Sequence, residues 1–308
     1  MPAKSKTPKL TFTSLDAKFP NELACKKYLA GLRWNGEPVC QHCGHKKSYQ
    51  FSNGDFKCAK CRKKYTVRTG TIFEDSKILL IKWFKASFVM TAHKKGISSH
   101  QLAKDIDVTQ KTAWFILHRL KFALKSKSFE KPLDGIVETD ETYFGGAEKN
   151  KHVAKKTQGA QGRCTKSKTP IFGMVERGGK LVAMTVKNTS SKTLQPIIKE
   201  HVAVGAKLMT DEWTAYVGLS KHFSHSFIRH GQGQYVNGEV HTNTIEGFWS
   251  LFKRGVNGIN HWVSVKHLDQ YVGEYAFRYN TRKANDGQRF EVVMANLDGR
   301  LTYKELIA

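Results

Sequence analysis

The chain has 308 residues, enough for about two domains, and its 51 Lys and Arg against 26 Asp and Glu give a formal net charge of +25. No run of about eighteen apolar residues occurs, and the cationic N-terminus has no apolar signal segment, so we expect a cytoplasmic protein without a membrane partner. The charge is concentrated in residues 1–131, with 27 basic and 9 acidic side chains. Such a field predicts a nucleic acid as the partner.

Four of the six cysteines form two C-x-x-C pairs, Cys40 with Cys43 and Cys58 with Cys61. This spacing is typical of one zinc ion held by four thiolates, and the short alternating runs SYQFS and KYTVRTG predict a small β ribbon around it. Disulfides are the alternative, which a reducing cytoplasm disfavours. A ribbon of this size needs its metal to fold, so we expect a structural zinc ion.

Three helices are predicted within residues 78–125. The first ends at Gly96, the second begins after Ser98, and the third follows Thr109 with apolar residues at three- and four-residue spacing. Two short helices joined by a tight turn fit a helix-turn-helix, although any three-helix unit would share the pattern. We expect the last helix to present four side chains to DNA, namely Gln110, Lys111, Thr112 and Arg119.

The acidic residues mark a mixed α/β region. Strands are predicted over 135–146, which contains Asp140, and over 206–216, which contains Asp211; a hairpin with its turn at Gly178-Gly179 and a helix over 190–201 lie between them. The segment HTNTIEGFWSLFKRG (241–255) predicts a helix with a buried aromatic stripe and with Glu246 beside that stripe. Carboxylates from separate elements are the ligands with which proteins hold Mg²⁺ for phosphoryl transfer.

The segments TDETYFGG, TDEWTAY and HTNTIEGFWSLFKRG resemble, in this order, the three catalytic blocks of bacterial insertion-sequence transposases of the acidic-triad (DDE) class. The chain is similar to the ISXO-like group, which places a zinc ribbon and a helix-turn-helix ahead of the catalytic domain. The resemblance implies a ribonuclease-H-like fold. It also implies Asp140, Asp211 and Glu246 as catalytic ligands of two Mg²⁺ (or Mn²⁺) ions, and Lys253 and Arg254 as DNA contacts.

Several of these assignments have alternatives. Glu246 lies three residues after Asn243, so it would alternatively cap the start of its helix. Neighbours on a strand point to opposite faces, so only one member of each pair, Asp140/Glu141 and Asp211/Glu212, is expected to reach the metals. The sequence does not say which member, and Glu138, on the same strand face as Asp140, is a reserve candidate.

The segment 149–168 interrupts the first hairpin with seven cations and no acid. We expect it, with Lys155 and Lys156, to clamp the DNA backbone, a solvated loop being the alternative. The expected order is a basic N-terminal segment (1–35), a zinc ribbon (36–70), a helix-turn-helix module (76–130), a ribonuclease-H-like catalytic domain (132–290) and a C-terminal tail (291–308).

The resemblance implies a nucleoid-associated transposase without a small-molecule substrate. It would bind the terminal inverted repeats of its own element, cleave them to leave 3′-hydroxyl ends and join these ends to target double-stranded DNA. Holding two ends together implies a homodimer or a higher oligomer on DNA. The alternatives are a transposase-derived DNA-binding regulator without catalysis and a ribonuclease-H-like nuclease.

Overall fold

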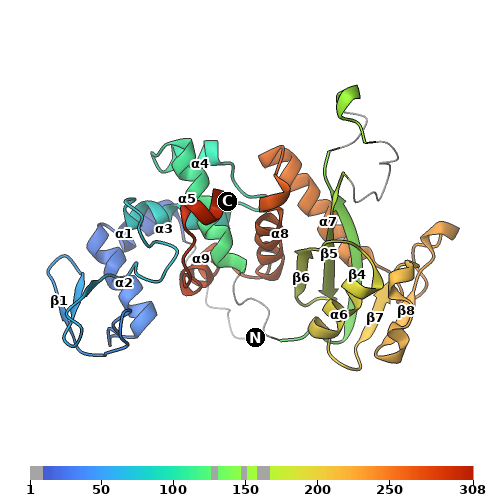
Figure 1. Ribbon diagram of the computed structural model, residues 1–308, viewed down its shortest axis with the longest axis horizontal. Helices are drawn as coiled ribbons and strands as arrows, with labels where there is room; N and C mark the ends of the chain where they lie inside the picture. Colours follow the sequence, from blue (N-terminus) through green and yellow to red (C-terminus); the bar gives the residue numbers. More distant parts are fainter. Residues whose placement is uncertain (1–9, 126–130, 147–150, 158–166, 308) are drawn as a thin grey trace, which may run out of the picture. The chain divides into compact units, whose positions relative to one another are not determined.

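The computed structural model describes residues 10–125, 131–146, 151–157 and 167–307. The chain divides into two compact units (Figure 1), the first made of residues 1–126 and 281–308 and the second of residues 127–280. None of the helices in the described ranges is long and apolar enough to cross a bilayer.

The first unit combines a small sheet with helices from both ends of the chain. The sheet is antiparallel in the order β1-β2-β3, with bounds Ser48–Gln50, Phe56–Cys58 and Lys64–Tyr65. The helices are α1 (Phe12–Lys18), α2 (Glu22–Trp34), α3 (Leu80–Ala92), α4 (Ser99–Asp105), α5 (Gln110–Lys125), α9 (Asp286–Ala295) and α10 (Tyr303–Ile307). The described part of the expected basic N-terminal segment, residues 10–35, is thus largely helical.

The three helices predicted within 78–125 are present as α3, α4 and α5. Ser98 caps α4 by accepting a hydrogen bond from the Gln101 N–H at 3.2 Å, and the Thr109 hydroxyl accepts from the Thr112 N–H, also at 3.2 Å, at the start of α5. The C-terminal boundary differs from the expected one. Helix α9 packs against α2, α3 and α5 and belongs to the first unit. The second unit therefore ends at residue 280, ten residues before the expected end of the catalytic domain.

The second unit is a mixed α/β fold around a five-stranded sheet in the order β6-β5-β4-β7-β8 (Figure 1). Strands β4, β5 and β6 are antiparallel neighbours, whereas β7 runs parallel to β4 and β8 parallel to β7. This arrangement confirms the expected ribonuclease-H-like class. The strands span Ile136–Phe144 (β4), Thr169–Glu176 (β5), Leu181–Thr185 (β6), Lys207–Thr210 (β7) and Ser224–Phe227 (β8).

The remaining elements of this unit are helices α6 (Ser191–His201), α7 (Asn243–Gly255) and α8 (Val265–Asn280), the short 3₁₀ turns η2 (Val153–Lys155), η3 (Thr214–Tyr216), η4 (Leu219–Lys221) and η5 (His230–Gln232), and the π-helix η6 (Val256–Asn260). Strand β8 was not predicted, because its sequence SHSF lacks the apolar alternation of a half-buried strand.

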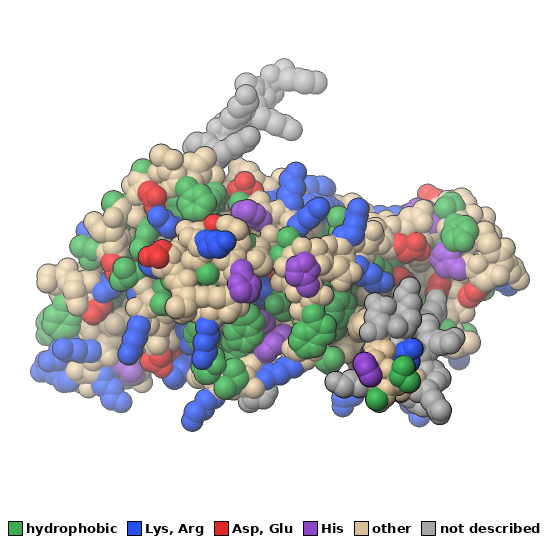
Figure 2. All heavy atoms as spheres, turned by 90° about the horizontal axis from the view of Figure 1, so that it is seen from above, with side chains coloured by type: hydrophobic (Ala, Val, Ile, Leu, Met, Phe, Trp, Pro, Cys, Tyr) green, Lys and Arg blue, Asp and Glu red, His purple; other side chains and the backbone are tan. Residues whose placement is uncertain are grey.

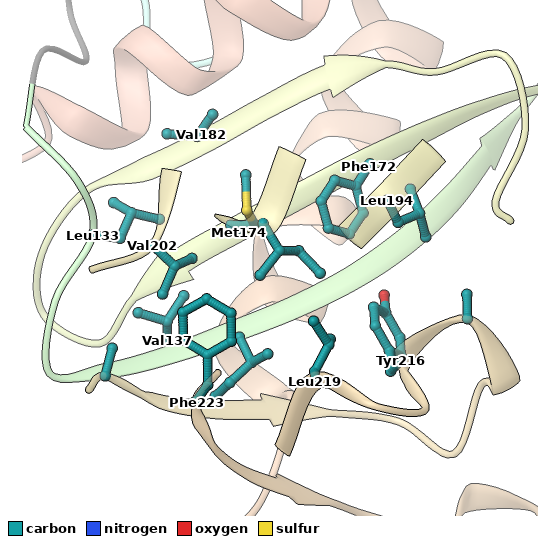
Figure 3. Packing of buried hydrophobic residues seen from close by; sticks show 14 residues of the cluster. Leu133, Val137, Phe172, Met174, Val182, Leu194, Val202, Tyr216, Leu219 and Phe223 are labelled. Atoms are coloured by element: carbon teal, nitrogen blue, oxygen red, sulfur yellow. The ribbon is translucent and has the colours of Figure 1, made fainter. Parts of the chain in front are cut away.

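Two hydrophobic clusters cover the two faces of this sheet. One contains Val137, Phe172, Leu194 and Tyr216 and joins β4 and β5 to α6 and η3 (Figure 3). The other contains the predicted apolar stripe, four residues of α7 and the first residue of η6, which are at most 4% exposed: Ile245, Phe248, Trp249, Phe252 and Val256. Successive side chains of β4 point to opposite faces of the sheet, so they alternate between the side of α6 and the side of α7.

Helix α7 lies so close to β5 that only glycine fits at position 173. A Cβ atom there would lie 2.6 Å from the Trp249 ring and 3.0 Å from Ile245. Gly173 is the register partner of Asp140, so the close approach fixes α7 directly beside the first of the predicted catalytic carboxylates.

Candidate catalytic and metal sites

Three carboxylates meet where the central strands end. Asp140, Glu141 and Asp211 each contribute one carboxylate oxygen to a group in which these three oxygens lie within 4.8 Å of one another. Asp140 and Glu141 belong to β4, and Asp211 directly follows β7. The ladder between these parallel strands covers only Ile136–Glu138 of β4, so the carboxylates lie beyond its end.

The end of this ladder corrects the expectation that strand alternation admits only one member of each acidic pair. Asp140 and Glu141 start from opposite faces of β4, yet both reach the position of Asp211 because β7 does not cover this part of the edge. The other pair does separate. Asp211 is 6% exposed and accepts a hydrogen bond from the Trp213 N–H at 2.9 Å, whereas Glu212 is exposed and accepts from the Gly231 N–H at 2.8 Å.

Tyr216 is a member of this site that the sequence analysis missed. Its ring is 1% exposed within the cluster of Figure 3, and its hydroxyl donates to Glu141 Oε1 at 2.6 Å. Burial, followed by the charges of Glu141, Asp140 and Asp211, raises the pKa of Tyr216 well above its ordinary value, so the phenol stays a hydrogen-bond donor. The only signal in the sequence was its position five residues after Asp211.

Glu246 lies outside the group of three carboxylates. It is exposed on the first turn of α7, where its Oε1 accepts from the Thr242 hydroxyl at 2.7 Å and lies 3.5 Å from His230 Nε2. The alternative of a cap at Asn243 is wrong, because Asn243 is already helical and the N-cap residue is Thr242.

Glu138 performs the capping instead, and it does so from the neighbouring strand. This carboxylate is 0% exposed and accepts from the backbone N–H groups of Thr244 at 2.7 Å and Ile245 at 3.1 Å, two N–H groups in the first turn of α7. It also pairs with Arg177 Nε at 2.6 Å and lies 3.3 Å from His241 Nδ1. The reserve metal ligand of the sequence analysis is thus the anchor that ties α7 to β4.

Lys253 lies on α7 close enough to Asp140 for their charges to interact. Desolvation lowers the pKa of Lys253, the charge of Asp140 opposes this effect, and nearby Lys168 reinforces it. The Lys253 ammonium therefore adds positive charge beside the carboxylates. Arg254 is exposed, with its Nε donating to the Ser250 carbonyl oxygen at 3.3 Å.

The three converging carboxylates fit a divalent cation. Mg²⁺ and Mn²⁺ prefer carboxylate oxygens, and one Mg²⁺ ion takes only one or two carboxylates from a protein. Asp140, Glu141 and Asp211 present only oxygen ligands, and their mutual repulsion at this separation is relieved by a bound cation.

The four clustered cysteines also form a ready metal site. The Sγ atoms of Cys40 and Cys61 lie 3.7 Å apart and those of Cys43 and Cys58 lie 3.6 Å apart. Four thiolates about 2.3 Å from one zinc ion lie roughly 3.8 Å from each other, so the geometry fits tetrahedral zinc. Burial raises the pKa of Cys58, but hydrogen bonds from the Cys61 and Lys60 N–H groups outweigh it and lower the value to about 6.

Zinc removal gives a first testable prediction. We expect one zinc ion per chain by metal analysis, its loss in Cys58→Ser, and rapid trypsin cleavage of the ribbon at Arg62 and Lys63 once the ion is gone, because so small a sheet folds with its metal. Cys25→Ala is the matched control, since Cys25 is a buried free thiol outside the cluster. Full zinc content in Cys58→Ser would contradict the assignment.

The predicted DNA-contacting residues of α5 do not all reach the surface. Gln110 and Lys111 are exposed, and Thr112 is half-buried. Arg119 does not present its side chain at the surface as expected. It is 3% exposed, and its Nη1 donates to the carbonyl oxygens of Ile72 at 2.6 Å and Glu74 at 2.8 Å. The segment containing these carbonyls covers that flank of α5, so the guanidinium satisfies buried acceptors.

The basic insert lies partly outside the described residues, which include 151–157 and 167–168 of it. Lys156 is exposed at the end of η2, and only the backbone of Lys155 is described. Figure 2 shows Lys and Arg side chains over the visible face, with fewer Asp and Glu among them, as the net charge requires. Cys164 also lies outside the described residues.

Two families of transposase domains match this chain. The ISXO2-like transposase domain family matches residues 132–280, and the transposase zinc-ribbon domain family matches residues 20–64. A protein in transposable element ISH50 of Halobacterium salinarum is 29% identical over 274 residues, covering 84% of this chain and 91% of the relative. A transposase-like protein of Haemophilus influenzae is 31% identical over 102 residues, covering 33% of this chain and 81% of the relative.

Among solved structures, the HTLV-2 integrase catalytic core domain in complex with magnesium has a TM-score of 0.30 at 15% identity, covering 53% of this chain and 98% of that one. A simian T-cell lymphotropic virus intasome in complex with PP2A regulatory subunit B56 gamma has a TM-score of 0.28 at 13% identity, covering 58% and 64%. Scores this low support no argument about fold, which depends here on strand order and on the two matched domains. The chain belongs to the transposases that combine a transposase zinc ribbon with an ISXO2-like transposase domain.

Proposed function

We propose that this transposase binds the terminal inverted repeats of its own element and catalyses metal-dependent cleavage of DNA strands and their transfer to target DNA. The observation that carries the proposal is the convergence of Asp140, Glu141 and Asp211 beyond the end of the β4–β7 ladder, in the unit that matches the transposase domain. Such a group of carboxylates can hold divalent cations, and these cations stabilise the charges that develop during phosphoryl transfer. The reaction needs little covalent chemistry from the protein.

In this proposal Asp140 and Asp211 hold two Mg²⁺ or Mn²⁺ ions, with Glu246 as the third ligand supplied by α7. Two such ions, when bound, activate the attacking oxygen and stabilise the leaving oxygen of an in-line displacement. Glu138 supports the role of Glu246 in two ways. It caps the backbone N–H groups at the start of α7, so Glu246 is not needed for capping, and it fixes this helix beside Asp140. Lys253 neutralises part of the phosphate charge next to Asp140.

We assign DNA recognition to the helix-turn-helix module. Gln110, Lys111 and Thr112 at the start of α5 read or position the DNA, and Lys253, Arg254, Lys155 and Lys156 contact its backbone. Backbone contacts of this kind release counterions, so binding weakens steeply as salt rises. A homodimer or a higher oligomer holds the two element ends together. Because its proposed partner is DNA, the protein acts at the nucleoid.

The test uses purified protein, DNA carrying the sequences that flank its gene, and Mg²⁺ or Mn²⁺. We expect 3′-hydroxyl ends and joined products from the wild-type protein, and neither from Glu246→Gln, while both proteins bind the DNA equally in a mobility-shift assay. Cleaved but never joined products would identify a nuclease. Binding without cleavage in either metal would identify a DNA-binding regulator, and full activity of Glu246→Gln would remove Glu246 from the site.

A further inference from the structure

We propose that Glu141 is an additional metal ligand of the catalytic site and that Tyr216 is the residue that positions it. This inference builds on the proposed function, since it assumes that divalent cations bind at Asp140 and Asp211. It adds to the acidic triad a carboxylate that approaches from the opposite face of the sheet.

The position of Glu141 supports its role as a metal ligand. Its carboxylate belongs to the group in which all ligand oxygens lie within 4.8 Å of one another, whereas Glu246 does not. Glu141 starts on the sheet face of Val137 and reaches the group over the part of the β4 edge that β7 leaves uncovered. Asp140 starts on the α7 face, so ligands approach this edge from both sides.

Tyr216 orients the Glu141 carboxylate. Its buried hydroxyl donates to Glu141 Oε1 at 2.6 Å, and its ring is fixed among apolar neighbours at the end of η3 (Figure 3). A carboxylate has about four acceptor positions on two oxygens, so this hydrogen bond is compatible with a metal contact. Partners that orient a ligand in this way are a regular part of metal sites.

The same turn also places Asp211, which links the two carboxylates. Asp211 Oδ1 accepts from the Trp213 N–H at 2.9 Å, and η3 then carries the chain to Tyr216. One short segment thus holds Asp211 directly and Glu141 through Tyr216. A merely structural role, in which Glu141 only satisfies the buried hydroxyl, predicts no effect of Glu141 on metal affinity.

The experiment measures binding of Mn²⁺ to the zinc-loaded, full-length protein without DNA, by the loss of the free Mn²⁺ signal in electron paramagnetic resonance. We expect Glu141→Gln to weaken Mn²⁺ binding at least tenfold and Tyr216→Phe, which keeps the carboxylate and removes the hydroxyl, to weaken it severalfold. Glu212→Gln is the matched control, because this neighbouring glutamate bonds to the Gly231 N–H outside the group, and it should bind Mn²⁺ like the wild type.

The outcomes separate the two proposals. If Asp211→Asn weakens Mn²⁺ binding but Glu141→Gln does not, the catalytic metal site stands and Glu141 is only the acceptor of the Tyr216 hydroxyl. If the wild-type protein binds no Mn²⁺ beyond the level of Asp211→Asn, the metal site of the proposed function fails, and the role of Glu141 fails with it. Circular dichroism of each variant shows whether it is folded, and Tyr216→Phe provides a second test if Glu141→Gln is not.

Discussion

Replacing Asp211 with asparagine is expected to lower the rate of metal-dependent DNA cleavage by about a thousandfold, because losing a ligand removes several kcal/mol of charge stabilisation in the transition state. Asparagine has nearly the same shape, and its amide oxygen can still accept the Trp213 N–H, which Asp211 Oδ1 accepts at 2.9 Å. The turn after β7 therefore keeps its conformation. Single-turnover cleavage of end DNA in Mg²⁺ and in Mn²⁺ measures the effect.

Two comparisons make this result specific to the site. Glu212→Gln removes the same charge from the adjacent position, where the side chain is exposed and directed to Gly231, and should change the rate less than twofold. DNA affinity of Asp211→Asn should match that of the wild-type protein. Cleavage by Asp211→Asn at the wild-type rate would show that the three-carboxylate group is not the catalytic centre.

Replacing Glu138 with alanine is expected to lower the free energy of unfolding of the second unit by about 3–5 kcal/mol, the range for breaking a buried ion pair from one side. The substitution leaves the Arg177 guanidinium without its 2.6 Å partner and uncaps the Thr244 and Ile245 N–H groups. Urea denaturation followed by circular dichroism measures the loss.

A surface ion pair of the same unit provides the control. Glu239 lies 3.8 Å from Lys207 with both side chains exposed, so Glu239→Ala should cost less than about 1 kcal/mol. If Glu138→Ala costs no more than this control, Glu138 does not anchor α7. Glu138→Gln retains acceptor oxygens without the charge and should fall between the two.

The sequence predicts those parts of the fold whose signal is local. The stripe of α7 and the helices α3, α4 and α5 follow from apolar residues at helical spacing and from capping residues, and the thiolate cluster follows from two short cysteine motifs. The polar edge strand β8 carries no such signal. The buried position of Arg119 depends on carbonyl oxygens more than 40 residues away in the chain, which no local pattern reveals.

Only part of the candidate site could be predicted from the sequence: Glu246 lies outside the group of three carboxylates, and Tyr216 was missed. Asp140 and Asp211 meet as expected, but strand alternation alone would have separated Glu141 from them. Its inclusion depends on where the β4–β7 ladder stops, a property of two strands together. Similarly, Glu138 was only a reserve candidate for the metals, because the helix end that it caps lies over 100 residues further along the chain.

The division of the first unit between the two ends of the chain has a consequence for folding during synthesis. Phe290 on α9 packs with Phe84 on α3, their ring centroids 5.9 Å apart, so the core of the first unit stays incomplete until α9 has been made. The second unit contains all of its own core by residue 280. A ribosome making this protein therefore completes the second unit before the first, although most of the first unit is encoded earlier. A chain released early, after residue 280, would have a finished second unit and an uncovered hydrophobic face on α3.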